Sequence, residues 1–504
     1  MNKVELSELG LIPEEILKHQ ERIKSVLEKG SSNFISIIDC CRLENSGIVD
    51  PEQLKDSARQ KPEGFVGFIP SAGAASRYFQ ALRPLEQALL KNSKNDIEHE
   101  LNALSEQGAK NWALPKLIHL AMEGGAEFAI NKKDGILEAI NLPKALQPCV
   151  ASGESFLSLK NLEHEKLEGL EGQVFITPPN KEAMFNSDIP NPKLKTKFID
   201  QGPELSTIRF DLEGEPILDQ NSKVSPVPAG HGTLVKLFPA VLKEFPQCHS
   251  VLIRNIDNVT GTSEKILNDT KLFQQLHQAA LKKLNEIRGL LKADKITEAS
   301  EVASNFTSDL GIDSVGSGYE AEDYPEQLRE LYKLQVTLFH YQHSCAPIFG
   351  KKDPLALIKH LYMRPLNTMG QVPNSGKDVG GTPVYADISG ATATICLEVP
   401  HASQTDKERF LMDPKKATHF NPVFVAAELI DNSEPYDSTN TPFWILAQKQ
   451  FEMKSVLYHE TVLYELLGNS IMANTLFPAI PRGLFNPHKT AKDTSNQTLE
   501  SCLG

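Results

Sequence analysis

This sequence has few cysteines for its length, and none is arranged as cysteines are in metal sites or disulfide frameworks. The chain has 504 residues and seven cysteines, namely Cys40, Cys41, Cys149, Cys248, Cys345, Cys396 and Cys502. They form no CxxC pair, and an odd number fits reduced thiols better than a set of disulfides. We therefore expect a cytoplasmic protein with free thiols.

The sequence also has no excess of basic charge and no long apolar run, and we do not expect its N-terminal segment to act as a leader. Its formal charge of −13 argues against nucleic acid or an anionic membrane as the main partner. The N-terminal MNKVELSELGLIPEE is acidic and broken by Pro13, unlike a signal peptide. No apolar stretch is long enough to span a bilayer. With 40% hydrophobic residues, the chain can still form two or three domains with a sizeable core.

The most informative segment is FVGFIPSAGAASRYF, which runs from Phe65 to Phe79. Its apolar start predicts a short buried strand. Small residues follow, namely Ser71, Ala72, Gly73, Ala74, Ala75 and Ser76. Side chains this small let backbone N–H groups approach a phosphate, and Arg77 can add a bidentate contact. A turn of small residues is also an ordinary way to pack a strand against a helix, so the segment alone leaves both interpretations open.

Two later segments have a similar pattern. VSPVPAGHGTL contains Gly230, His231 and Gly232, and HSVLIRNIDNV predicts a buried strand that ends near Asp257. A carboxylate at the carboxyl end of a parallel strand can hold Mg²⁺ against phosphate oxygens. From position alone, an aspartate between two asparagines is more often a cap or turn residue. His231 fits a turn histidine bonded to backbone equally well.

The order of the remaining segments predicts an α/β fold with a mixed sheet flanked by helices. We expect a helical N-terminal extension over residues 1–60, a core over 61–365, and a C-terminal α+β part over 366–504. The core should carry helical insertions at about residues 80–140 and 263–350, the second with an apolar stripe that starts after Ser263. The segment GGTPVYADISGATATICLEVP predicts a hairpin that turns at Ser389 and Gly390, and residues 491–504 should fray.

Several motifs together resemble the UDP-sugar pyrophosphorylase group of nucleotidyltransferases. In order, they are IPSAGAASR, NLPKAL, PAGHGT, NIDN, GGTPVY with LEVP, HFNPVFV and FNPHKTAKD. Within that group the chain most resembles a bacterial family of unknown function, from about Phe65 to Asp493. The resemblance implies a Rossmann-like, GT-A-like nucleotidyltransferase fold. The chain departs from the group in the loop, where alanines replace two glycines and Ser76 stands for a threonine. It also departs after GHG, where Thr233 replaces the acidic residue that often follows.

The resemblance implies synthesis of a nucleotide-sugar from a nucleoside triphosphate, with UTP favoured, and a sugar 1-phosphate. Pyrophosphate leaves, and Mg²⁺ is the cofactor. Because the attacking phosphate oxygen is already ionised, the reaction needs positioning and charge neutralisation more than a general base. The alternative is a catalytically inactive nucleotide- or nucleotide-sugar-binding regulator, which the alanine-substituted loop keeps open.

The resemblance also implies roles for individual residues. Asp257 is the metal ligand, and Arg77, Lys144 and Lys489 contact the phosphates. Lys116, in a second LPK segment, is the alternative to Lys144. The nucleotide-binding residues are Ser71, Ala72, Gly73, Ala74, Ala75, Ser76, Gly230, His231 and Gly232. The residues on the substrate side are Asn255, Gly381, Glu398 and Asn421.

Other enzyme classes lack their motifs in this sequence. The segment starting His459-Glu460 has Leu463 where a HExxH zinc protease needs its second histidine. Neither GxSxG nor GxxxxGK[ST] occurs, so the sequence offers no motif for a hydrolase of that type or a P-loop kinase.

Overall fold

The computed structural model describes residues 3–29, 35–73, 77–219, 222–312, 325–340, 342–343, 353–376, 380–388, 391–431, 444–451 and 454–503. The chain forms two compact units. Unit 1 comprises Met1–Phe65, Gly202–Ile253 and Lys271–Arg482, and unit 2 comprises Val66–Gln201, Arg254–Thr270 and Gly483–Gly504. Each unit is assembled from stretches far apart in the sequence, whereas the segments expected from the sequence were contiguous.

Unit 2 contains three neighbouring strands in the order β2 (Phe65–Pro70), β3 (Leu170–Thr177) and β4 (Lys195–Asp200). Strands β3 and β4 are parallel, with Gly172 opposite Lys195. Five of the six residues of β2 are buried, as expected for a strand covered on both faces. The predicted strand at Phe65 is therefore confirmed. Helix α7 (Phe156–Lys166) precedes β3, and α8 (Glu182–Asp188) connects β3 to β4.

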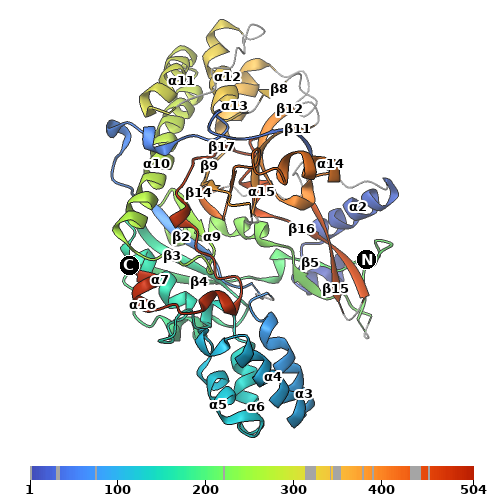
Figure 1. The fold of residues 1–504 in the computed structure, drawn as a ribbon. Coiled ribbons are helices and arrows are strands. Elements are labelled where there is room, and N and C mark those ends of the chain that lie inside the picture. The colour runs from blue at the N-terminus through green and yellow to red at the C-terminus, as the bar shows by residue number, and fades with distance from the viewer. Residues whose placement is uncertain are drawn as a thin grey trace. The chain divides into compact units, whose positions relative to one another are not determined.

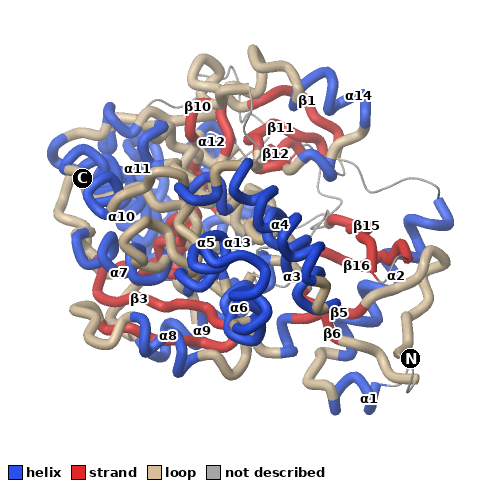
Figure 2. Tube along the Cα trace, turned by 60° about the horizontal axis from the view of Figure 1, so that its bottom comes forward, coloured by secondary structure: helices blue, strands red, loops and turns tan. Residues whose placement is uncertain are grey.

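The insertion after β2 is helical, as predicted. It comprises α3 (Arg83–Lys91), α4 (Lys94–Glu106), α5 (Lys116–Asn131) and α6 (Lys133–Ile140), which lie side by side in Figures 1 and 2. Apolar residues of these helices are buried together in one core, among them Leu89, Leu101 and Ile136. The Ser93 side chain accepts a hydrogen bond from the Asp96 amide and so caps α4.

The C-terminal end of unit 2 is ordered, so the expectation of a frayed tail is wrong. Residues Ala491–Thr494 form a 3-10 turn, and Leu499–Leu503 form helix α16. Cys502 is buried in the same core as α7. The Asn496 amide donates to the Asn111 carbonyl. Contacts with a distant helical insertion hold this end, and composition alone did not reveal them.

Unit 1 contains four neighbouring strands in the order β17 (Asn474–Leu476), β9 (Leu366–Met369), β14 (Phe424–Glu428) and β7 (Ser250–Arg254). Strand β9 is parallel to β17 and antiparallel to β14. The helices of this part are α10 (Glu264–Lys292), α11 (Ile296–Leu310), α12 (Glu326–Thr337) and α13 (Pro354–Met363). Most of the predicted stripe on α10 is fully buried, including Leu276, Leu284, Ile287 and Leu291, whereas Leu272 at its start is partly buried.

A second sheet of unit 1 has the order β1 (Ser36–Cys40), β11 (Thr382–Ile388), β12 (Ala391–Leu397) and β8 (Gln342–His343). The predicted hairpin is confirmed because Thr382 pairs with Leu397, although the turn residues Ser389 and Gly390 lie outside the described residues. Helices α1 (Lys3–Glu8) and α2 (Pro13–Lys29) agree with a helical N-terminus. Strand β1 differs from that expectation, since this part of the N-terminal segment is extended and pairs with β11, which lies far along the chain.

Smaller elements complete unit 1. They are β5 (Ser206–Ile208), β6 (Pro226–Pro228), α9 (Phe238–Glu244), β10 (Val372–Pro373), α14 (Gln404–Asp406), β13 (His419–Phe420), β15 (Ile445–Phe451), β16 (Lys454–Glu460) and α15 (Leu463–Leu466). Parallel and antiparallel strands with flanking helices confirm the predicted α/β class with mixed sheets. The six described cysteines are free, and Cys345 lies outside the described residues. Among the helices described, none has the length and apolar character needed to cross a membrane.

Candidate functional site

The residues predicted from the sequence fall into two groups, one in each unit. Unit 2 contains Ser71, Ala72, Gly73, Arg77, Lys144, Asn255, Asp257 and Lys489, together with Ala74, Ala75 and Ser76, which lie outside the described residues. Unit 1 contains Gly230, His231, Gly232, Gly381, Glu398 and Asn421.

Lys144 and Asp257 form the centre of the first group. Lys144 begins the 3-10 turn Lys144–Leu146 that follows α6, and Asp257 follows β7. The ammonium of Lys144 lies 2.9 Å from Asp257 Oδ2, although the two residues are far apart in the sequence. The Lys144 side chain is 6% exposed and that of Asp257 23% exposed. The carboxylate is therefore still open to solvent on one side.

Aromatic rings surround the Lys144 ammonium. It lies 5.0 Å from the ring centre of Tyr78 and 5.3 Å from that of Phe156, which are cation–π distances. Tyr78 follows the small-residue loop directly, so this contact connects the loop to the lysine. Burial lowers the pKa of Lys144, and the neighbouring Asp257 carboxylate opposes that shift.

The C-terminal FNPHKT segment contacts both charged residues through its backbone. The ammonium of Lys144 donates a hydrogen bond to the His488 carbonyl, and the His488 amide donates to the Asp257 carbonyl at 2.9 Å. Sequence reasoning selected Lys489 and missed His488, whose contacts are made by backbone atoms that any residue has. Lys489 itself is partly buried, with its ammonium 6.0 Å from the Phe485 ring centre.

The loop after β2 is open where it is described. The Ser71 amide donates to the Ile176 carbonyl at 3.0 Å, which anchors the start of the loop. Gly73 is exposed, and a Cβ added there would meet no atom within 4 Å. Arg77 is exposed at the other end. The open side of Gly73 leaves room for a ligand to approach the backbone.

The donors in unit 2 fit a divalent cation that arrives with phosphates. Among the residues described, no three His, Cys, Asp or Glu side chains group as a metal site. Mg²⁺ commonly takes one or two carboxylates and completes its shell with water and substrate phosphate oxygens. Asp257, partly exposed next to a lysine, can supply that one carboxylate, and Asn255 is partly buried on the same loop.

Lys116, the alternative to Lys144, lies elsewhere in unit 2. It is the first residue of α5 and is exposed. The described residues include no ion-pair partner for it, whereas Lys144 is held between a carboxylate, a carbonyl and two aromatic rings. The geometry therefore favours Lys144 as the lysine of this site.

In unit 1, the glycines of GHG pack against the protein's own backbone. Gly230 has a φ of 103°, and a Cβ there would lie 2.4 Å from the Thr461 carbonyl oxygen. A Cβ at Gly232 would lie 2.5 Å from the Val462 carbonyl oxygen. Close packing against residues 461–462 therefore explains why glycine is needed here. Burial lowers the pKa of His231.

Tyr464, which sequence reasoning missed, connects the predicted residues of unit 1. Its ring meets that of His231 edge-on at 6.3 Å, and its hydroxyl donates to the Asn421 carbonyl at 3.0 Å. A Cβ at Gly381 would lie 2.7 Å from the Tyr464 ring. The Asn421 side chain is fully buried and bonds only to backbone, including the Gly370 carbonyl at 2.7 Å. Asn421 thus holds the loop in shape.

Glu398 lies next to this group and is partly exposed. Its amide donates to His401 Nδ1 at 3.1 Å, so the neutral imidazole carries its proton on Nε2. That nitrogen lies 3.6 Å from a carboxylate oxygen of Glu465, which is fully buried. Burial raises the pKa of Glu465 well above its ordinary value.

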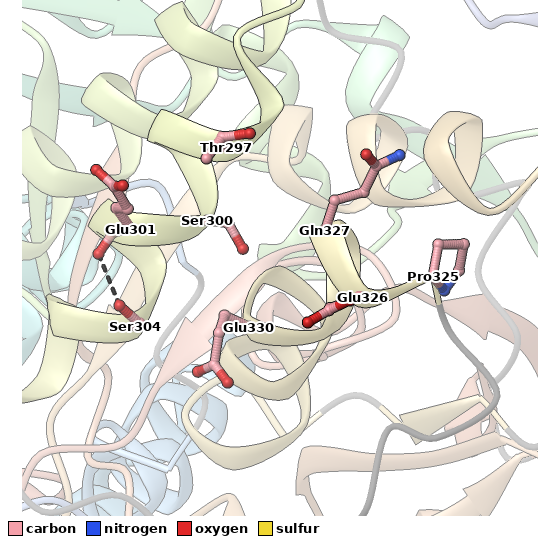
Figure 3. Close-up of a pocket in the computed structure, with 8 residues that line it drawn as sticks. All are labelled: Thr297, Ser300, Glu301, Ser304, Pro325, Glu326, Gln327 and Glu330. Atoms are coloured by element: carbon pink, nitrogen blue, oxygen red, sulfur yellow. Dashed lines mark hydrogen bonds between the residues drawn. The ribbon is translucent and has the colours of Figure 1, made fainter.

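A separate groove in unit 1 contains none of the predicted residues. It has a volume of about 540 Å³ and lies between α11 and α12 (Figure 3). Its lining residues are Thr297, Ser300, Glu301, Ser304, Pro325, Glu326, Gln327 and Glu330. Among the described lining residues, three carry carboxylates and none is cationic, which makes this groove a poor match for a phosphorylated ligand.

The chain is a mixed α/β protein whose residues 180–498 match a family model described as a domain of unknown function (DUF4301). Because the match covers more than half of the sequence, the protein belongs to this family. Membership of a family of unknown function, expected from the motif series, is thus confirmed. No curated protein in the comparison matches the chain.

Similar solved structures include UDP-glucose pyrophosphorylases. A variant of the Leishmania major enzyme in complex with UDP-glucose is 13% identical with a TM-score of 0.47, and the match covers 94% of this chain and 73% of that chain. A UDP-glucose phosphorylase from Trypanosoma brucei is 12% identical with a TM-score of 0.49, covering 99% of this chain and 79% of that one. Because both TM-scores are below 0.5, the chain's own residues must support any function.

Proposed function

We propose that this protein is a Mg²⁺-dependent nucleotidyltransferase that joins a nucleoside triphosphate to a sugar 1-phosphate and releases pyrophosphate. The main support is the pair formed by Lys144 and Asp257 at 2.9 Å, where Asp257 is partly open to solvent and Lys144 contacts Tyr78, close in sequence to the exposed Gly73 and Arg77. A carboxylate for the metal and a lysine for the phosphates are the two groups that this reaction needs most.

In the proposed reaction an oxygen of the sugar 1-phosphate attacks the α-phosphorus of the triphosphate. A new P–O bond forms, and the bond to the β-phosphate breaks, so that pyrophosphate leaves with the electron pair. Because the attacking oxygen is already ionised, the protein supplies no general base. Mg²⁺ held by Asp257 would neutralise charge on the phosphate oxygens.

The chain's own cations orient the phosphates in this proposal. Lys144 turns from Asp257 towards the oxygens of the triphosphate or the sugar phosphate, and Arg77 and Lys489 bind the remaining oxygens. Amides of the loop that includes Gly73 bind the triphosphate as backbone donors. The motif series further favours UTP as the nucleoside triphosphate.

The test is a matrix of nucleoside triphosphates against sugar 1-phosphates with Mg²⁺, read by pyrophosphate release. One positive combination identifies both the reaction and the substrates. If no combination releases pyrophosphate while calorimetry detects binding of a nucleotide or a nucleotide-sugar, the protein is instead a binding protein. That second function is suggested by the alanines in the loop, since glycines are usual at those positions in the group it resembles.

A further inference from the structure

A fully buried group of charges in unit 2 contacts the loop that carries Asp257. Lys160 and Glu163 lie on α7, and their side chains are 0% and 1% exposed. The ammonium of Lys160 lies 2.7 Å from Glu163 Oε2. A guanidinium nitrogen of Arg254 lies 3.5 Å from the same oxygen, and the Arg254 side chain is 1% exposed.

The two α7 side chains bind the backbone of this loop directly. Glu163 Oε1 accepts hydrogen bonds from the amides of Thr260, at 2.6 Å, and Gly261, at 2.8 Å. Lys160 donates to the carbonyl of Asn258. Of the four residues that follow Asp257, three therefore form backbone hydrogen bonds with the Lys160–Glu163 ion pair.

The Asn258 side chain extends this arrangement to the C-terminal segment. Its amide nitrogen donates to the Leu484 carbonyl at 3.0 Å, and its oxygen accepts from the Asn486 amide at 2.7 Å. Two residues further on, His488 bonds to Asp257 and Lys144 through its backbone. A continuous set of hydrogen bonds thus leads from α7 through the loop to the segment that closes the Lys144 site.

Stability alone does not explain these charges. Removing an ion pair from water costs about as much as its attraction returns, and apolar residues of similar size commonly serve as well. Burial and the nearby Arg254 lower the pKa of Lys160 to about 8, and Glu163 opposes this shift. The side chain therefore stays charged at pH 7, although burial makes the charged form less favourable. What apolar side chains could not do is bind the loop's amides and carbonyl.

We propose that Lys160, paired with Glu163, is a positioning residue that fixes residues 255–261 and, through Asn258, residues 484–488. The Asp257 carboxylate and the His488 carbonyl are thereby held where Lys144 meets both. The identity of the ligands that Asp257 and Lys144 bind rests on the proposed function. The positioning role of Lys160 does not depend on it. The two can therefore fail separately.

The first test is hydrogen–deuterium exchange of Lys160→Met. This change leaves Glu163 paired with Arg254, so no anion is buried alone. We expect peptides covering residues 255–261 and 484–490 to exchange about tenfold faster, the scale of one lost charge-assisted hydrogen bond. The matched control is Lys166→Met, an exposed lysine on the same helix, which should leave both peptides unchanged. Lys160→Arg, which keeps the charge, should restore part of the protection.

A second readout is the affinity for Mn²⁺ alone, measured by electron paramagnetic resonance. We expect about a tenfold weaker affinity in Lys160→Met than in the parent, with the fold retained by circular dichroism. Unchanged exchange in both peptides would overturn the positioning role. Faster exchange in a protein that neither binds Mn²⁺ nor transfers nucleotide would leave the role intact and refute the proposed function instead.

Asn258→Ala keeps the inference testable if Lys160→Met does not fold. This variant removes the side chain that joins the loop to the C-terminal segment without disturbing the ion pair. Residues 484–490 should then exchange faster while Thr260 and Gly261 keep their protection. Equal protection of residues 484–490 in parent and variant would overturn the link.

Discussion

At the scale of single residues, the site depends on a lysine and an aspartate that neutralise each other. Lys144 is nearly enclosed by Tyr78, Phe156 and the His488 carbonyl, whereas Asp257 keeps one side exposed. In the proposed reaction, a cation held by Asp257 would free the Lys144 ammonium to bind phosphate. Replacing either partner should affect a different part of the proposed reaction.

Asp257→Asn should leave the protein folded and abolish Mg²⁺-dependent turnover. An amide keeps the size of the side chain but lacks the negative charge that a hard divalent cation requires. The measurement is turnover against Mg²⁺ concentration, with Asp134→Asn, an exposed aspartate on α6, as control. Turnover equal to that of the parent at the same Mg²⁺ would show that Asp257 is not the ligand.

Lys144→Ala should lower kcat/KM about a hundredfold or more, the usual loss when one preorganised electrostatic donor is removed. Lys116→Ala should have little effect because Lys116 is an exposed residue at the start of α5. The two variants remove the same charge, so net charge cannot account for a difference between them. A large loss in Lys116→Ala alone would reverse the assignment.

At the scale of elements, the C-terminal segment completes the surroundings of Lys144. Truncation before Phe485 should abolish activity because it removes the His488 carbonyl and the partner of Asn258. Lys489→Ala should mainly weaken use of the triphosphate, and Lys489→Glu should be worse because a like charge would face the phosphates. Steady-state kinetics separate these effects. Full activity after truncation would show that the site is complete without the segment.

The residues after Asp493, which the sequence suggested would fray, are held by contacts within unit 2. Thr494 accepts a hydrogen bond from the Ala113 amide, and Cys502 is buried. Truncation after Asp493 should therefore lower the thermal unfolding temperature while kcat/KM, measured well below that temperature, stays close to the parent value.

Helix α2 is held in unit 1 by a pair of buried histidines. His19 and His459 stack with ring centres 4.1 Å apart, and burial lowers the pKa of His19 to about 3. The folded pKa of His19 lies below the unfolded value of 6.5. The contribution of the neutral, buried imidazole to the free energy of unfolding is therefore complete above pH 6.5 and is lost as the pH falls towards 3. Within that window, each histidine buried in this way lowers the free energy of unfolding by about 1.4 kcal/mol for every pH unit that the pH falls.

Replacing His19 should therefore reduce the sensitivity of unit 1 to acid. In His19→Gln the difference between unfolding temperatures at pH 7 and pH 5 should be smaller than in the parent, even if the variant is less stable at pH 7. Differential scanning calorimetry at the two pH values measures this difference. An equal or larger difference in the variant would show that His19 does not titrate as its burial implies.

Sequence patterns predicted the elements whose signal is local. The apolar run at Phe65 predicted β2, and the stripe after Ser263 predicted α10. Strand β1 was missed because its stability comes from β11, which lies far along the chain. His488 was missed because its contacts with Lys144 and Asp257 are made by backbone atoms, and backbone roles leave no mark on residue type. The buried Lys160 and Glu163 carry no distinguishing sequence pattern, since Lys and Glu are usually solvated.

At the scale of the whole molecule, a net charge of −13 contrasts with the phosphate binding that we propose. The protein must concentrate its cations locally, and unit 2 gathers Arg77, Lys144 and Lys489 in segments linked by the contacts of Tyr78 and His488. Such local concentration allows binding of a polyanion without general affinity for nucleic acid. Added double-stranded DNA should therefore not compete with the triphosphate.

Nucleotidyl transfer by this protein can be followed by ³¹P nuclear magnetic resonance of a single reaction mixture. The mixture contains the protein, Mg²⁺, UTP and a set of sugar 1-phosphates. Our account predicts that UTP signals decline while pyrophosphate and a diphosphate diester appear in equal amounts, and that Asp257→Asn forms neither. UTP and sugar 1-phosphates that persist unchanged, or UTP that is hydrolysed with no diester formed, would contradict it.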